Sequence, residues 1–251
     1  MNKFYEKKTL ALLISAYKAD KNLINIVDNF LNQKLPRGWD VKIYIGVDGC
    51  KDTFNLLKEN KINFYYSSNN VGTYIICNSL IDIAKKFNHD MYARFDADDI
   101  PTKNFLFYGI KRCLKLNFVR TYYQWENHPT KSKKEKKLAY GITFFDNEVL
   151  SKVGGYSRYR VEGDHDFVVR LKNLGYFGDF GNIFLKKLYK KPLFKRLYNP
   201  SSLTADKKTA HGSSYRNSIR QQLERDREAG NRLIPKMVNL ELIKNNLSQK
   251  N

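Results

Sequence analysis

Met91-Tyr-Ala-Arg-Phe-Asp-Ala-Asp-Asp99 decides the fold class, because an apolar strand runs directly into three carboxylates. Residues 91–95 have the length and composition of a buried strand. Asp96, Asp98 and Asp99 follow within four positions and would repel one another unless a cation or a proton intervened. A strand that ends in such a cluster indicates a ligand site at the carboxyl edge of a sheet.

Three further strands precede this stretch, and helices separate them. The expected strands are the apolar runs 9–17, 41–47 and 62–66. The expected helices follow Asp20, span 53–61 and run through 75–84, with Asp20 and Asp52 as N-caps of the first two. Four strands alternating with three helices in under 100 residues predict right-handed βαβ units and a mostly parallel sheet.

Polar residues follow each expected strand. Ser15 and Tyr17 stand at the end of the first, Asp48 at the end of the second, and Gly72 in the loop after the third. Because the carboxyl ends of parallel strands meet at one edge, these side chains are expected to gather there with Asp96.

The second half is less regular. It is expected to hold a charged loop at 131–137, a strand at 139–145, a short helix at 146–153 and a helix at 164–174. A polar helical tail follows from residue 215. The domain organisation expected is a nucleotide-sugar-binding half at 1–120, an acceptor-binding half of the same domain at 121–210, and a tail at 211–251.

In this order, the motifs resemble the family 2 glycosyltransferases with the GT-A fold, from about Thr9 to Leu203. The resemblance implies an α/β, Rossmann-like, mostly parallel sheet with helices on both faces and a mixed acceptor-binding half. It also implies an inverting enzyme that moves one sugar from a nucleotide-diphospho-sugar to a glycan, glycolipid or glycoprotein acceptor. A UDP-sugar is the donor expected first.

On the donor side, the resemblance implies contacts with the nucleotide-sugar and with Mn²⁺ or Mg²⁺. Asp98 and His211 are the metal ligands implied, because such ions typically take one or two protein carboxylates and complete their shell from water and phosphate. Asp48 resembles the residue that binds the nucleoside base, and Asp99 a supporting or capping group. The donor-binding positions implied are Ser15, Tyr17, Asp48, Gly72, Asn78 and Asp96.

On the acceptor side, Gly155 and Tyr156 resemble the acceptor-binding segment, and Asp164 takes the place of the catalytic base. Inversion requires a base that removes the acceptor proton as its oxygen attacks the anomeric carbon. The family's usual Glu before that base is Gly163 here, which leaves Glu162 as a rival. Asp166 is better explained as a first-turn or capping carboxylate.

The net charge of +20 indicates an anionic partner. A second hypothesis therefore stays open, in which the protein is a basic nucleic-acid- or polyanion-binding module without catalysis. That hypothesis leaves the aspartates at the strand ends unexplained, and we expect no specific nucleic-acid partner. A sugar-nucleotide pyrophosphorylase would open with a glycine-rich phosphate loop, which Ser15 to Ala19 lacks. A catalytically silent relative also stays open.

The three cysteines contain no C-x-x-C pair, and the longest early apolar run is too short to span a membrane. We therefore expect a cytoplasmic protein. Residues 184–198 interleave Lys and Arg with aromatic residues, which fits either peripheral contact with an anionic membrane at its inner face or an apolar side that closes the core.

Overall fold

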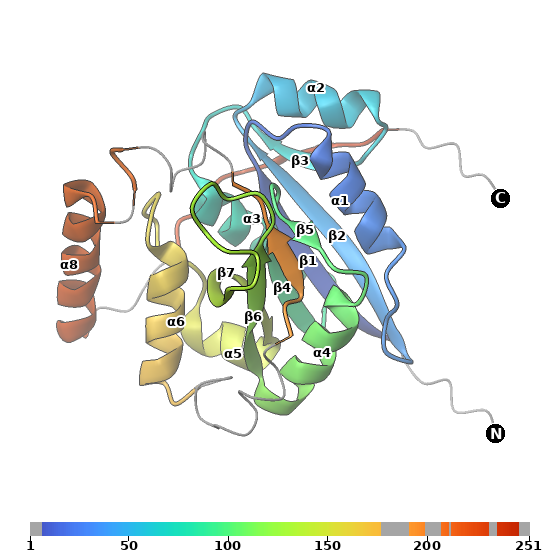
Figure 1. The fold of residues 1–251 in the computed structure, drawn as a ribbon. Helices are drawn as coiled ribbons and strands as arrows, with labels where there is room; N and C mark the ends of the chain where they lie inside the picture. Colours follow the sequence, from blue (N-terminus) through green and yellow to red (C-terminus); the bar gives the residue numbers. More distant parts are fainter. Residues whose placement is uncertain (1–6, 177–190, 199–206, 211, 231–234, 246–251) are drawn as a thin grey trace.

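The computed structural model of the chain describes residues 7–176, 191–198, 207–210, 212–230 and 235–245 (Figure 1). Within them, nine strands form one sheet in the order β5-β8-β6-β7-β4-β1-β2-β3-β9. The strands are β1 (Lys8–Ala16), β2 (Trp39–Asp48), β3 (Phe64–Ser67), β4 (Met91–Asp96), β5 (Ile100–Pro101), β6 (Phe118–Trp125), β7 (Lys136–Asp146), β8 (Phe194–Arg196) and β9 (Glu241–Ile243). The helices are α1 (Asn22–Leu31), α2 (Lys51–Glu59), α3 (Thr73–Lys85), α4 (Phe105–Leu116), α5 (Asn147–Val153), α6 (Gly163–Asn173) and α8 (Ser214–Glu228).

The centre of the sheet is parallel, as the sequence predicts. β1 pairs in parallel with β2 and β4, and β2 pairs in parallel with β3. β1 lies at the middle, and residues 10–14 are fully buried. A strand covered on both faces needs a continuous apolar run, which is the pattern at 9–17.

Helices cover both faces, because the side chains of β1 alternate between two apolar clusters. Leu10, Leu12 and Ile14 join the cluster that includes residues of α1, α2 and α4. Ala11 and Leu13 join the cluster formed with α3, α5 and α6. The predicted fold class, a Rossmann-like α/β sheet with helices on both faces, is confirmed (Figure 1).

Two predicted helix caps are wrong. Asp20 lies one residue before the N-cap position of α1, where its carboxylate accepts the N–H of Asn22 at 2.8 Å. Asp52 lies inside the first turn of α2, and Cys50 holds the N-cap position. Both carboxylates remain near the positive end of a helix, which is where the dipole favours them.

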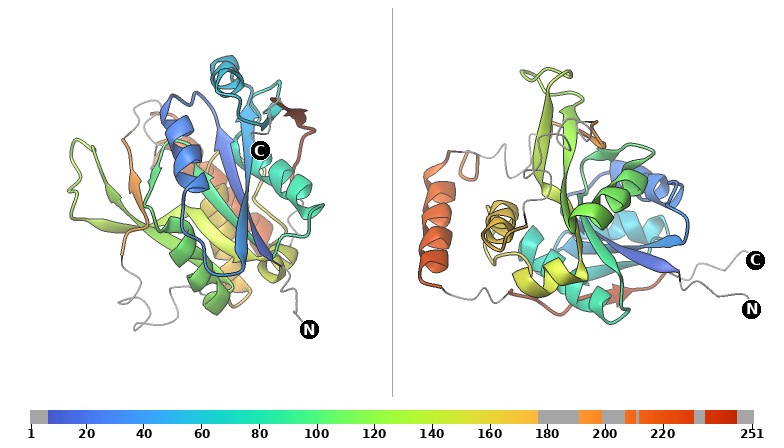
Figure 2. Two further views of the ribbon diagram at one scale, coloured as in Figure 1. Left: turned by 90° about the vertical axis from the view of Figure 1, so that its right-hand side faces the viewer. Right: turned by 90° about the horizontal axis from the view of Figure 1, so that it is seen from below.

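The second half adds antiparallel strands. β7 pairs antiparallel with β4 on one side and with β6 on the other, and its first residues belong to the predicted charged loop. β6 and β7 extend away from the body as a projecting hairpin (Figure 2). This arrangement agrees with the mixed character expected for the second half.

The C-terminal segment is helical only in part. α8 lies outside α6 in Figure 1 and in the right-hand view of Figure 2. Beyond it, β9 pairs antiparallel with β3, so the expectation of a helical tail is wrong for Glu241–Ile243. β9 extends the sheet at the end opposite β5.

The basic aromatic segment is described only from residue 191 onward, and residues 184–190 lie outside the described part. Leu193 and Phe194 are buried in the core, and β8 pairs with β5 and β6. For these residues the apolar side closes the core. Among the described helices, none is long and apolar enough to cross a membrane.

Candidate active site

The carboxyl ends of β1, β2 and β4 bring several predicted donor-site residues to one edge. Ser15 lies opposite Asp96 of β4 and opposite Gly46 of β2. Tyr17 follows β1 and is 48% exposed, so its ring is available to a ligand. The clustering expected from parallel strands is present.

Asp48 ends β2 and fastens the loop that leads into α3. Its Oδ1 accepts the N–H of Val71 at 2.6 Å, and its Oδ2 accepts the N–H of Gly72 at 2.9 Å. Burial raises the pKa of Asp48 above its ordinary value, and the two backbone N–H groups oppose the rise. Gly72 has φ +103°, a backbone conformation that favours glycine. Asp48, which is 3% exposed, therefore holds the loop at this edge in place.

Asp96 is held by a buried arginine on the same strand. Arg94 Nη2 lies 2.7 Å from Asp96 Oδ1, and Arg94 Nη1 donates to the carbonyl of Gly141 at 2.7 Å. Burial disfavours the charge on Arg94, yet the neighbouring Asp96 and other groups raise its pKa well above its ordinary range. Arg94 thus stays charged and fixes Asp96 against β7.

Asp164 lies in the first turn of α6, where the helix dipole favours a carboxylate. Its Oδ1 accepts the hydroxyl of Tyr74 at 2.8 Å and the N–H of His165 at 2.9 Å. Burial and the nearby Asp164 raise the pKa of Tyr74 well above its ordinary value, so Tyr74 remains a donor. One oxygen of Asp164 is thereby held while Oδ2 faces β7.

Gly141 lies close to both carboxylates. A Cβ at this position would lie 3.3 Å from Asp96 Oδ2, 3.5 Å from Asp164 Oδ2 and 2.5 Å from Arg94 Nη1. The two carboxylate oxygens therefore approach the same point, from β4 on one side and α6 on the other. This convergence of two acidic groups is the central feature of the site.

The remaining carboxylates after β4 form a crowded acidic loop. Asp99 is buried, and its Oδ1 accepts the N–H of Leu197 at 3.2 Å. Burial raises the pKa of Asp99 well above its ordinary value, Arg196 opposes the rise, and the charges of Asp98 and Asp96 add to it. Asp99 thus supports the loop, while Asp98 is partly exposed at the site edge.

A divalent cation would find few protein ligands here. In the described part of the chain, no group of three or more His, Cys, Asp or Glu side chains could hold a metal ion. His211 lies outside that part. A metal held by one or two carboxylates together with substrate phosphates needs no such cluster, and the partly exposed Asp98 beside other carboxylates fits that donor set.

Glu162, the rival base, is engaged in ion pairs. Its side chain is 1% exposed and lies 2.7 Å from Arg216 and 2.6 Å from Arg220. Asp166 is also 1% exposed and pairs with Arg170 and Arg227, so it is more than the capping group expected. Of the three acidic residues at the start of α6, Asp164 is the one whose carboxylate faces the site.

Asn78, Gly155 and Tyr156 make contacts within the protein, and their contacts with donor and acceptor stay predictions. The buried Asn78 amide donates to the carbonyls of Tyr156 and Lys236 and accepts the N–H of Tyr156 at 2.9 Å. Tyr156 is 1% exposed and stacks on Phe167. A Cβ on Gly155 would lie 2.8 Å from Asn78 Oδ1. These residues join α3 to the segment before α6.

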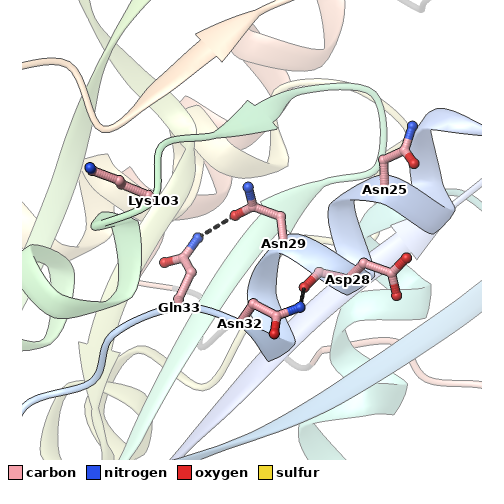
Figure 3. A pocket seen from close by; sticks show the side chains of 6 residues that line it. All are labelled: Asn25, Asp28, Asn29, Asn32, Gln33 and Lys103. Carbon is pink, nitrogen blue, oxygen red and sulfur yellow. Dashed lines mark hydrogen bonds between the residues drawn. The ribbon is translucent and has the colours of Figure 1, made fainter.

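A hollow of about 360 Å³ lies elsewhere, along α1 (Figure 3). Its lining is polar and contains none of the predicted site residues. The residues that line it are Asn25, Asp28, Asn29, Asn32, Gln33 and Lys103. α1 packs in the cluster on the other face of the sheet from α3 and α6, so this hollow is separate from the site.

The sequence interpretation missed Tyr74 and Gly141. A signal existed for Gly141, because a glycine inside a strand often marks a close approach of another group. Tyr74 offered none, since an aromatic residue in the first turn of a helix is ordinary. Its contact with Asp164 joins residues 90 positions apart.

Comparisons with known proteins show a shared fold. No family model and no curated protein matches this sequence. The S. aureus TarS 1-349 crystal structure in complex with UDP-GlcNAc matches with a TM-score of 0.55 and 10% identity over 77% of this chain. The complex of the same TarS fragment with UDP matches with a TM-score of 0.52 and 13% identity over 76% of this chain. This chain spans 60% of the length of the first structure, and the likeness establishes that the two proteins share a fold.

Proposed function

We propose that this protein is an inverting glycosyltransferase of the family 2 kind that uses a nucleotide-diphospho-sugar, a UDP-sugar first among donors. The observation that carries the proposal is the convergence of Asp96 and Asp164 beside Gly141. The fold shared with TarS, which was crystallised with UDP-GlcNAc and UDP, supports it. The acceptor class proposed is a hydroxyl of a glycan, glycolipid or glycoprotein.

The proposed reaction is a single displacement. The acceptor oxygen forms a bond to the anomeric carbon as the bond from that carbon to the diphosphate oxygen breaks. The acceptor proton passes to Asp164 Oδ2, while Tyr74 holds Oδ1 and so orients the carboxylate. The nucleoside diphosphate leaves with the bonding electron pair, and attack from the opposite side inverts the anomeric configuration.

On the donor side, Asp96 would position the sugar or ribose, and Ser15, Tyr17, Asp48 and Gly72 would line the nucleotide. Asp98 would hold Mn²⁺ or Mg²⁺, with His211 as a second proposed ligand. When bound, such an ion supplies charge stabilisation to the departing diphosphate. The halves 1–120 and 121–210 would then contribute the donor and acceptor surfaces of one domain, and peripheral contact with an anionic membrane stays a prediction.

The test is thermal unfolding with UDP, GDP, CDP and TDP, each with and without Mn²⁺. A nucleotide at a hundredfold excess over its dissociation constant stabilises the folded state by about 2.7 kcal/mol. The stabilisation should depend on Mn²⁺ and vanish in Asp98→Ala, whereas Asp28→Ala on the outer side of α1 should keep it.

A second arm tests the base. Asp164→Asn should keep the nucleotide response and lose transfer, measured as nucleoside diphosphate released from the donor that the binding screen identifies. A Glu162→Gln variant that loses more transfer at equal folded fraction would assign the base to Glu162 instead. The absence of any nucleotide response, with retained binding to heparin, would replace the proposal by a polyanion-binding module.

A further inference from the structure

α8 lies beside α6 (Figure 1). Ion pairs of three arginines join it to the start of that helix. Arg216, Arg220, Leu223 and Arg227 are spaced by four, three and four residues, so they share one face of the helix. Arg216 and Leu223 are the buried residues of α8. A helix with such a face is held in place by what its arginines bind.

Two of these arginines bind Glu162, directly before α6. Arg216 Nη1 donates to Oε1 at 2.7 Å, and Arg220 donates to Oε2 through Nε at 2.6 Å and to Oε1 through Nη2 at 3.2 Å. Glu162 has φ +64°, a conformation that residues other than glycine rarely adopt. Such a backbone persists when its surroundings over-determine it, and the two arginines supply that restraint.

The third arginine binds the first turn of α6. Arg227 Nη1 lies 2.7 Å from Asp166 Oδ1, and Arg170 Nε lies 2.8 Å from Oδ2. Arg170 also donates to the carbonyls of Val153 and Gly155, which ties the same carboxylate to the segment before α6. Glu162 and Asp166 are thus both neutralised by cations that come in large part from α8.

We infer that α8 is a positioning element for Asp164, with Arg216 and Arg220 acting through Glu162 and Arg227 acting through Asp166. The inference rests on the proposed role of Asp164 as base. Asp164 lies between the two restrained residues, so the same contacts that set the start of α6 set the direction of its carboxylate.

The arginines of α8 also balance the negative charges around Asp164. The charged and titratable groups around Asp164 are Tyr74 on α3, Arg94 and Asp96 on β4, Tyr140 on β7, Tyr156 before α6, Glu162, His165 and Asp166 around the start of α6, and Arg220 and Arg227 on α8. Removing one α8 arginine leaves the carboxylates of Glu162 and Asp166 less compensated. Because like charges repel, the start of α6 should then be held less firmly around Asp164.

The experiment compares Arg220→Gln with Arg225→Gln in the full chain. Both variants remove one positive charge from α8, but Arg225 bonds Gln222 on its own helix rather than α6. Hydrogen exchange of the peptide covering residues 163–173 reports the start of α6 without any substrate. We expect exchange there to quicken about tenfold in Arg220→Gln and to stay unchanged in Arg225→Gln.

Nucleoside diphosphate released from the donor that the binding screen identifies supplies the functional readout. In Arg220→Gln, kcat should fall by about tenfold to a hundredfold at a nearly constant KM. Adding Arg220→Gln to Glu162→Gln should cause little further loss, because the arginine acts through that glutamate.

The outcomes separate this inference from the proposed function. Unchanged exchange in Arg220→Gln would overturn the positioning role whatever the turnover. Quicker exchange with unaltered kcat and KM would also overturn it, since α8 would then only cover α6. Quicker exchange in a protein that turns over no nucleotide-sugar would support α8 as the restraint on Asp164 and count against the proposed transfer.

Discussion

Gly141→Ala is the substitution that tests the central feature of the site. The added methyl group would lie 2.5 Å from Arg94 Nη1, closer than real contacts of this kind, and in contact with Asp96 and Asp164. Arg94 must therefore move, although its Nη1 donates to the Gly141 carbonyl at 2.7 Å and its Nη2 holds Asp96 at 2.7 Å. The change is small in volume and falls beside the two carboxylates.

The expected magnitude follows from these contacts. Weakening one hydrogen bond from a charged donor costs about 1.5 to 3 kcal/mol. The reduced freedom of the unfolded chain offsets about 0.4 to 1 kcal/mol. A net loss of about 0.5 to 2.6 kcal/mol lowers Tm by roughly 1 to 10 °C for a chain of this size. Turnover should fall about a hundredfold, because a shift of about 1 Å in reacting groups has that effect.

Gly109→Ala on α4 is the matched control. Its Cβ would meet the ring of Phe144 in the core, away from both carboxylates. Overpacking costs about 1 to 3 kcal/mol, so Tm should fall at least as far as in Gly141→Ala. Turnover per folded molecule should be retained, as measured by UDP release well below Tm. Equal loss of turnover in the two variants would refute the argument that Gly141 leaves room for the two carboxylates.

Three further substitutions test other contacts. Asp48→Asn should cost about 1 to 3 kcal/mol and weaken the nucleotide-induced rise in Tm, because an amide group would face the N–H of Gly72. Burial lowers the pKa of His89, whose ring is hydrogen-bonded to Tyr44. As the pH falls, the unfolded chain therefore binds a proton at this histidine before the folded protein does. The free energy of unfolding should be highest above about pH 6.5 and fall below it by at most about 1.4 kcal/mol per pH unit. Asp166→Asn should cost about 3 kcal/mol in urea unfolding, since it breaks buried ion pairs.

Each of these has a matched control on a less buried residue of the same type. Asp28→Asn should leave Tm and nucleotide response as they are, whereas a matching loss would mean that Asp48 acts only through net charge. His128→Gln should keep the acid-side loss of stability that His89→Gln removes. Asp52→Asn removes a carboxylate in the first turn of α2 and should lower the free energy of unfolding by under about 1 kcal/mol. A loss equal to that of Asp166→Asn would contradict the stabilisation assigned to the buried ion pairs.

The parallel half of the sheet was predictable because its signal is local. The run 9–17 and the strand before Asp96 are each a series of mostly apolar consecutive residues, which is the pattern of a strand buried on both faces. The structure has strands at both places. α4 and β6 gave a weaker pattern, since buried Arg112 and Arg120 interrupt their apolar faces. β9 has three residues, too few for any periodicity.

The site was predictable only in part. Asp48 and Asp96 were predictable because each stands at the end of an apolar strand, and the structure places both at one edge of the sheet. The sequence could not show which polar side chains make hydrogen bonds or ion pairs within the protein. The side-chain amide of Asn78 is hydrogen-bonded to the backbone of Tyr156, and Glu162 forms an ion pair with an arginine 54 positions away. Such contacts depend on the packing of distant segments, and no pattern of neighbouring residues carries them.

The pairing of β9 with β3 bears on how the chain folds during synthesis. Asn245 donates to the side chain of Asn63, a contact that spans 182 positions. Until the ribosome has produced residues 241–245, the outer edge of β3 has unpaired N–H and C=O groups. An open edge of this kind can pair with the edge of another nascent chain, and contacts between distant segments form slowly. Closing this side of the sheet is thus a late step, and before it the protein is exposed to misassembly.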